Sequence, residues 1–90
     1  MPLWYSRPTR FIDVAWTLST DPNAASTNVK RGTTSGGPYT LLINVQNPNN
    51  AYRDFQVNPG QTYFYVTSEV DNSGSESPNS AEISATVEFP

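Results

Sequence analysis

Residues 57–66 read VNPGQTYFYV, a proline–glycine turn followed by a run of aromatic and β-branched residues. The place of Tyr63 directly after this turn is typical of a tyrosine corner, in which the hydroxyl folds back onto the backbone a few residues upstream. The ring then fills the core while its polar end stays satisfied. We therefore predict that Tyr63 is buried at the start of a strand. The alternative is a surface tyrosine that simply follows a turn.

The sequence on both sides of this stretch keeps a period of two, with turn residues at the spacing of an all-β sandwich or barrel. One face of residues 11–18, for example, comprises Ile12, Val14, Trp16 and Leu18. We expect Trp16 to be the central core residue between two sheets. The pattern predicts one domain, residues 1–90, without helices. Its strands are expected at residues 3–6, 11–18, 27–31, 39–45, 51–55, 63–70 and 81–87.

Composition excludes several classes of function. The formal net charge is −3, and the five basic residues are scattered apart from Lys30 and Arg31, so nucleic-acid binding is not expected. No apolar run approaches the ~18 residues that span a bilayer, so membrane insertion is not expected either. The chain has no Cys and no His, which excludes Ser–His and Cys–His triads and thiolate metal sites. We expect no cofactor and no metal, and we find no signal peptide in residues 1–10.

Several segments together resemble the fibronectin type III family, in particular its bacterial extracellular branch. They are Trp16, VKRGTTSGGPYTLL at residues 29–42, AYRDFQVNPGQTYFYV at residues 51–66 and VDNSGSESPNSAEISATV at residues 70–87. The resemblance implies an immunoglobulin-like, seven-stranded antiparallel β-sandwich. The first, second and fifth predicted strands would form one sheet, and the other four would form the second sheet. In bacterial proteins such domains typically separate catalytic and carbohydrate-binding domains.

Three polar residues occupy positions that strand alternation turns toward the core, namely Thr27, Thr67 and Glu69. The predicted third and sixth strands are antiparallel neighbours, so these residues should converge at one end of the sandwich. One interpretation is a polar pocket in which Glu69 acts as a base or a ligand contact. The alternative is that the strand ends open outward and Glu69 reaches solvent. The resemblance implies aromatic or apolar residues here and at Lys30, so engineering of the chain is a further hypothesis.

The first functional hypothesis is a spacer or accessory domain of a larger bacterial secreted or surface protein. The second is a natural or engineered module that binds a protein or a polysaccharide through one sheet face and the loops at residues 19–26 and 71–79. Its candidate partner-binding residues are Asn28, Lys30, Ser68 and Asn79. The third is a small site built on Glu69, but an enzyme is not expected because a lone carboxylate lacks a second titrating group. We expect a monomer, with self-association through exposed aromatic residues near the N-terminus as the alternative.

Overall fold

The computed structural model of the chain describes residues 11–87. The strands there are β1 (Ile12–Ala15), β2 (Ala24–Gly32), β3 (Thr40–Gln46), β4 (Ala51–Asp54), β5 (Thr62–Asp71) and β6 (Ile83–Thr86). The predicted strand at residues 3–6 lies outside the described residues, and each of the other predicted strands is present. No helix in the described part of the chain is long and apolar enough to cross a membrane.

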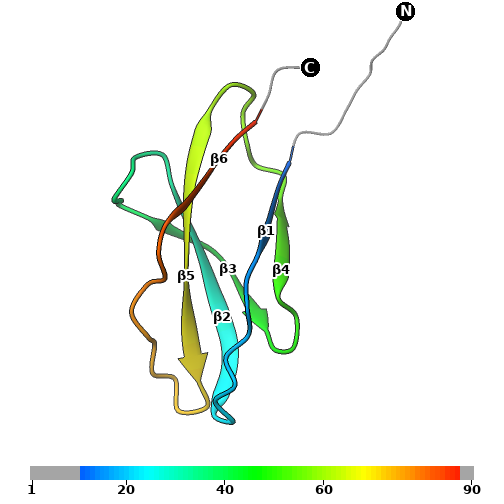
Figure 1. The fold of residues 1–90 in the computed structure, drawn as a ribbon, viewed down its shortest axis with the longest axis vertical. Helices are drawn as coiled ribbons and strands as arrows, with labels where there is room; N and C mark the ends of the chain where they lie inside the picture. Colours follow the sequence, from blue (N-terminus) through cyan, green and yellow to red (C-terminus); the bar gives the residue numbers. More distant parts are fainter. Residues whose placement is uncertain (1–10, 88–90) are drawn as a thin grey trace, which may run out of the picture.

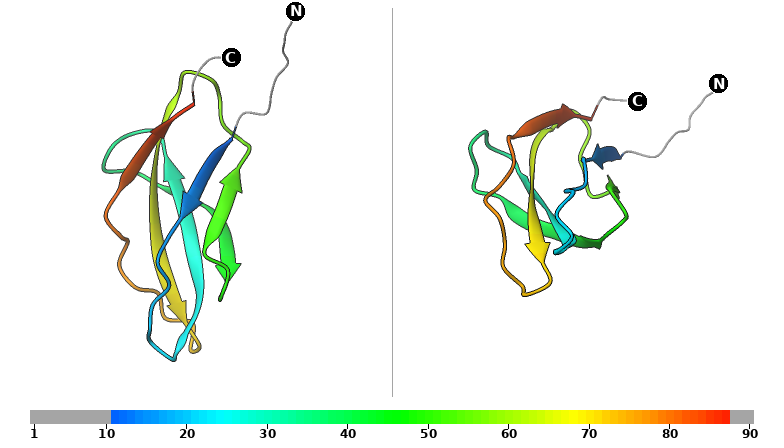
Figure 2. Two further views of the ribbon diagram at one scale, coloured as in Figure 1. Left: turned by 45° about the vertical axis from the view of Figure 1, so that its right-hand side comes forward. Right: turned by 60° about the horizontal axis from the view of Figure 1, so that its bottom comes forward.

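The strands form two antiparallel sheets that face each other (Figures 1 and 2). One sheet pairs β1 with β4, and the other has the strand order β3-β2-β5-β6. This is the division of strands that the resemblance implied, for every strand that the structure describes. Strands β1 and β6 are each paired on one side only within residues 11–87, so both are edges there.

Strand β1 is shorter than predicted because its partner begins late. The backbone N–H of Trp16 still donates to the carbonyl of Asn50 (3.1 Å), but β4 starts at Ala51 and the turn before it leads away from β1. Residues 17 and 18 therefore lie outside the ladder, although Leu18 keeps the expected half-buried orientation. The alternation of residues 11–18 was thus predicted correctly, whereas the length of the strand was not.

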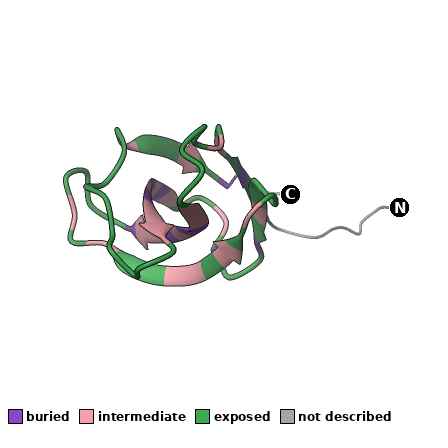
Figure 3. Ribbon diagram, turned by 90° about the horizontal axis from the view of Figure 1, so that it is seen from below, coloured by how far each residue is buried: buried purple, intermediate pink, exposed green. Residues whose placement is uncertain are grey.

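The core lies between the two sheets, and its centre is not the residue we expected. Val14, Val29 and Tyr65 are at most 1% exposed. Trp16 is only half-buried and packs against the edge of this cluster. It lies one residue beyond the end of β1. In Figure 3 most of the buried residues lie on strands, and most connecting loops are exposed.

The tyrosine corner is present. Tyr63 is buried, and its hydroxyl accepts a hydrogen bond from the backbone N–H of Asn58 (2.8 Å). The turn between them needs Gly60, whose φ of 78° lies in the left-handed region that favours glycine. The N–H of Gly60 donates to the carbonyl of Val87. The corner therefore joins the start of β5 to the residue that follows β6.

Tyr63→Phe is expected to lower the free energy of unfolding by about 1–2 kcal/mol, because the Asn58 N–H loses its acceptor in a partly buried turn. Urea denaturation monitored by tryptophan fluorescence measures this change. Tyr52→Phe is the matched control, since Tyr52 is half-buried and lies outside this turn. Equal stability of the two variants would contradict a structural role for the Tyr63 hydroxyl.

Candidate functional site

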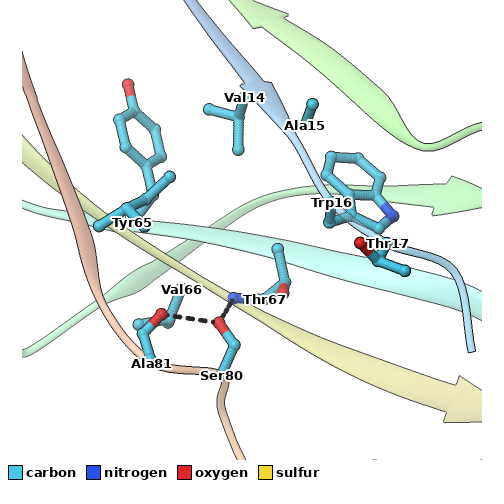
Figure 4. A pocket seen from close by; sticks show the side chains of 10 residues that line it. Val14, Ala15, Trp16, Thr17, Tyr65, Val66, Thr67, Ser80 and Ala81 are labelled. Atoms are coloured by element: carbon cyan, nitrogen blue, oxygen red, sulfur yellow. Dashed lines mark hydrogen bonds between the residues drawn. The ribbon is translucent and has the colours of Figure 1, made fainter.

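A groove runs along the open side of the sandwich, between the edge strands β1 and β6. Its first part has a volume of about 240 Å³. In Figure 4 the Trp16 indole and the Tyr65 phenol stand on either side of Val14, and Ser80 and Ala81 lie across from them. The lining residues are Val14, Ala15, Trp16, Thr17, Tyr65, Val66, Thr67, Ser80, Ala81 and Ile83.

The groove continues into a more polar part of about 220 Å³. This part contains the three residues of the predicted polar pocket, Thr27, Thr67 and Glu69. Thr27 is buried and sits directly opposite Glu69 in the β2–β5 ladder, whereas Thr67 and Glu69 are half-buried. The other lining residues are Trp16, Thr17, Ser19, Ser68, Ser77, Pro78 and Ser80. The structure thus brings the three predicted residues together in a groove lined mainly by hydroxyl groups.

One wall of the groove is held by serine hydroxyls in place of a regular ladder. The backbone N–H groups of Thr67 and Glu69 donate to the hydroxyls of Ser80 (2.9 Å) and Ser77 (2.8 Å). The N–H groups of both serines donate back to the carbonyls of the same two residues. These reciprocal bonds explain why β6 begins at Ile83 rather than at residue 81. They also use the Ser77 and Ser80 hydroxyls, which are therefore poorly placed as nucleophiles.

The polar end of the groove meets a shallow acidic pocket, in which Asp21, Asp71 and Glu76 already accept hydrogen bonds. Asp71 accepts hydrogen bonds from the N–H groups of Ser73 and Ser75, both at 2.9 Å. Bonds to Ser73 and Ser75 lower the pKa of the Asp71 carboxyl. Within residues 11–87 no three His, Cys, Asp or Glu residues are grouped so that they could hold a metal ion. The pocket is lined by Asp21, Glu69, Asp71, Ser75, Glu76 and Ser77.

The predicted partner-binding residues meet on the outer face of the larger sheet, around a carboxylate that the sequence analysis did not single out. The Lys30 Nζ lies 2.7 Å from Glu76 Oε2 and 2.8 Å from Asn79 Oδ1. The Ser68 hydroxyl donates to Glu76 as well. The hydrogen bond from Lys30, followed by those from Ser68 and Asn28, lowers the pKa of the Glu76 carboxyl to about 2. No sequence motif marks Glu76, which is brought over β5 by a bridge between its backbone and that of Val70.

The prediction that Ser68 offers a contact on the solvent face was wrong. Ser68 is 3% exposed, because the chain after β5 folds back and places Glu76 over it. Lys30 is half-buried and bonded to Glu76 and Asn79. The remaining candidates are Asn28, which is half-buried, and Asn79, which is exposed. The polar side chains of this face therefore mainly bond one another, and few of them are open to a partner.

Lys30→Met is expected to return the pKa of Glu76 toward its ordinary value of 4.5, because the largest cause of the depression is removed. Since the carboxyl titrates below its ordinary value in the folded chain, this interaction stabilises the fold above about pH 4.5 and is lost as the pH falls toward 2. Carboxyl NMR titration of both proteins measures the shift. An unchanged pKa in the variant would contradict the assigned ion pair.

A row of amides continues this outer face onto the edge strand β3. The Asn44 Nδ2 donates to Ser26 Oγ (3.0 Å) and to Asn28 Oδ1 (2.9 Å). The Gln46 Nε2 donates to Asn44 Oδ1 (2.8 Å). The two bonds from Asn44 cross from β3 to β2 and stabilise the pairing of these strands, whereas the bond from Gln46 lies within β3.

A buried ionic cluster joins the two sheets, and the sequence analysis missed it. Asp54 at the end of β4 is fully buried. Its Oδ2 accepts from Arg31 Nη1 and from the Tyr65 hydroxyl, both at 2.7 Å. Arg31 also donates to the carbonyl of Gln56 and lies 5.1 Å from the centre of the Tyr63 ring. Burial, and then the bond to Asp54, raise the pKa of Tyr65. The cluster is satisfied internally, so its role is structural.

Comparisons with known proteins fit this architecture. No protein-family model matches the sequence. An amylopullulanase of Thermoanaerobacter thermohydrosulfuricus is 36% identical over 80 residues, which are 88% of this chain and 5% of that enzyme. A β-1,2-glucanase of Parabacteroides distasonis superimposes with a TM-score of 0.77 at 27% identity, over 91% of this chain and 11% of the glucanase. The chain therefore spans only a small part of these enzymes.

Two further solved structures share the fold. The pectate lyase PelI of Erwinia chrysanthemi has a TM-score of 0.72 at 21% identity, which is a likeness of fold alone. An Fn3-like protein of Clostridium thermocellum has a TM-score of 0.71 and is 39% identical, and the match covers 88% of this chain and 75% of that protein. This chain and the Fn3-like protein thus share both their sequence, over most of each chain, and their fold. The chain therefore belongs to the fibronectin type III-like family.

Proposed function

We propose that this domain is a non-catalytic accessory module of a larger extracellular carbohydrate-active protein, in which it spaces or supports neighbouring domains. The observation that carries the proposal is its match to 5% of an amylopullulanase at 36% identity. A segment of that size supplies only a small part of such an enzyme. The match to 11% of a β-1,2-glucanase supports the same interpretation.

The chemistry of the groove also supports a role without catalysis. General acid–base catalysis needs titratable groups within hydrogen-bonding reach of a substrate and poised near the working pH. Glu69 is half-buried in the groove, while the hydroxyls of Ser77 and Ser80 are tied to the backbone of β5. The nearby Asp71 and Glu76 are held in their charged forms by local hydrogen bonds. These groups stabilise loops and strand ends.

An exchange experiment tests the proposal. The matching segment of the amylopullulanase is deleted in one variant and replaced by this chain in another. We expect kcat on a short soluble substrate to stay within about twofold in both variants. We also expect the replacement to restore a thermal half-life that the deletion shortens, because a packed neighbour stabilises adjacent domains.

Release of sugar from a polysaccharide by the isolated chain would overturn the non-catalytic assignment. Glu69→Gln is the matched variant for that assay, because it removes the charge of the groove carboxylate with little change in shape. Loss of the released sugar in this variant would assign a catalytic role to Glu69. A replacement enzyme no more stable than the deletion would contradict the supporting role.

A further inference from the structure

The outer face of the β1–β4 sheet carries an aromatic and charged surface that the fold does not require. We call it the small-sheet face. It is built from cross-strand pairs on the side of each strand that points away from the core. Asp13 is opposite Arg53 and Ala15 is opposite Ala51. Phe11 and Phe55 lie directly beyond the last pair of the ladder.

The two phenylalanines of this face are exposed where a solvent-facing sheet surface normally carries polar residues. Phe55 is 58% exposed and Phe11 is 37% exposed. Their ring centres are 6.0 Å apart at an angle of 62°, so one ring meets the other with its edge. This places two aromatic rings in water at one end of the β1–β4 pair.

A bidentate ion pair fixes the middle of the face. The Arg53 Nε and Nη2 donate to the two carboxylate oxygens of Asp13, at 2.7 and 3.0 Å. The guanidinium carbon lies 4.0 Å from the centre of the Phe11 ring. Arg53 therefore covers part of Phe11 and leaves Phe55 as the freer ring. The exposed edges of the Asp13–Arg53 ion pair offer hydrogen-bond donors of the guanidinium group and acceptors of the carboxylate beside the aromatic rings.

At the other end of the small-sheet face, the alanine side chains project little from the sheet. Ala15 and Ala51 are both exposed and present only methyl groups. From Phe11 to Ala15 the strand rises about 13 Å, at ~3.3 Å per residue. The face therefore has room for an extended ligand chain along the strands, which would contact the Phe55 ring at one end and the methyl groups of Ala15 and Ala51 at the other.

Size and charge favour a polysaccharide over a protein on this face. A stable protein interface uses roughly 20–30 residues on each side, whereas the small-sheet face consists of Phe11, Asp13, Ala15, Ala51, Arg53 and Phe55. Its two charges neutralise each other, which gives no attraction for an acidic membrane or a charged polymer. A pyranose ring has an apolar C–H face that packs on an aromatic ring and hydroxyls that bond carboxylate and guanidinium groups.

We propose that the small-sheet face binds a neutral polysaccharide chain, with Phe55 as the stacking residue and the Asp13–Arg53 pair as the hydrogen-bonding groups. The choice of a polysaccharide as the ligand rests on the proposed function. The site itself rests on the exposed rings and on the ion pair beside them.

The test is affinity electrophoresis of the 90-residue chain in native gels that contain pullulan or a β-1,2-glucan. We expect at least one of these neutral glucans to retard the wild-type chain. Phe55→Ala should weaken the interaction by about tenfold, as expected for loss of one aromatic stacking contact. The matched control is Leu41→Ala, because Leu41 is 54% exposed but lies on β3 in the other sheet. This control should bind like the wild type.

Two further variants separate binding from folding. Phe55→Leu keeps apolar bulk without an aromatic face, and it should weaken binding about as much as Phe55→Ala while its Tm stays close to that of the wild type. Arg53→Lys keeps the charge but cannot bond Asp13 in the same bidentate way, and it should bind more weakly. Full binding by Phe55→Leu, or equal losses in Phe55→Ala and Leu41→Ala, would overturn the proposed site.

The remaining outcomes identify a different occupant. Stronger retardation in polygalacturonate than in the neutral glucans would show that charge drives binding, and it would overturn the proposal. Light scattering without polymer that shows a dimer lost in Phe55→Ala would assign the face to a second copy of the chain, with the same consequence. No retardation in either glucan would overturn the binding site. The accessory role would still stand, because the exchange experiment tests it separately.

Discussion

Asp54→Ala is expected to lower the free energy of unfolding by about 3–5 kcal/mol, the usual cost of removing one partner from a buried ion pair. The side chain of Arg31 is 21% exposed and that of Asp54 is 1% exposed. The variant would therefore leave a largely buried guanidinium and the Tyr65 hydroxyl without their shared acceptor. For a domain of this size the loss is a large part of the total stability. Urea denaturation followed by fluorescence measures it.

A second Asp–Arg pair gives the matched control. Asp13→Ala removes the pair with Arg53, which has the same closest contact of 2.7 Å but side chains 57% and 51% exposed. Because solvent screens exposed pairs, this variant should barely change the unfolding transition. The double variant Asp54→Ala/Arg31→Met should be more stable than Asp54→Ala alone, since it leaves no unpaired charge. Similar stabilities of Asp54→Ala and Asp13→Ala would contradict the importance of the buried cluster.

Much of the fold followed from local patterns in the sequence. The turn at residues 57–62 and the tyrosine after it specify a corner that depends on a few neighbouring residues, and the structure contains that corner. Period-two alternation assigned residues to the correct face of β1, because one face of that strand packs on the core. The division of strands between sheets came from the resemblance to a family, since pairing between distant strands is not visible in a local pattern.

The same reasoning brought Thr27, Thr67 and Glu69 to one place. They lie on neighbouring antiparallel strands, so alternation and strand order together were enough to predict their convergence. Arg31 lies on the same side of β2 as Thr27, but its acceptor Asp54 comes from the opposite sheet. Only the distance between the sheets determines which inward residues meet across the core. The Asp54–Arg31–Tyr65 cluster could therefore not be predicted with the same rules.

The outer face of the larger sheet was predicted less well, and the cause lies in a loop. Ser68 alternates to the solvent side of β5 as expected, yet the segment after β5 folds back over it. The path of that segment depends on Ser77 and Ser80, whose hydroxyls replace backbone acceptors along β5. Such side-chain bonds have no periodic pattern in the sequence. A polar loop that extends into solvent and a polar loop that folds back over the sheet have the same composition. The burial of Ser68 could therefore not be predicted.

Tyr65→Ala is expected to lower the free energy of unfolding by about 3–5 kcal/mol, the range for truncation of a large buried side chain. Tyr65 is 1% exposed, and its hydroxyl donates to the buried Asp54 carboxylate. The variant therefore creates a cavity at the core centre and removes one donor from a buried charge. Trp16→Ala removes a larger side chain, but the indole is half-buried beside an open groove, so we expect a clearly smaller loss.

The order of these two variants locates the core. Volume alone would rank the tryptophan first, whereas burial ranks the tyrosine first, because cost depends on how many contacts are lost and how far the site can relax. Tyr65→Phe separates the two parts of the tyrosine effect, since it keeps the ring and removes only the bond to Asp54. Circular dichroism melts of all three variants measure the order. A lower Tm for Trp16→Ala than for Tyr65→Ala would contradict this order and would identify Trp16 as the central core residue.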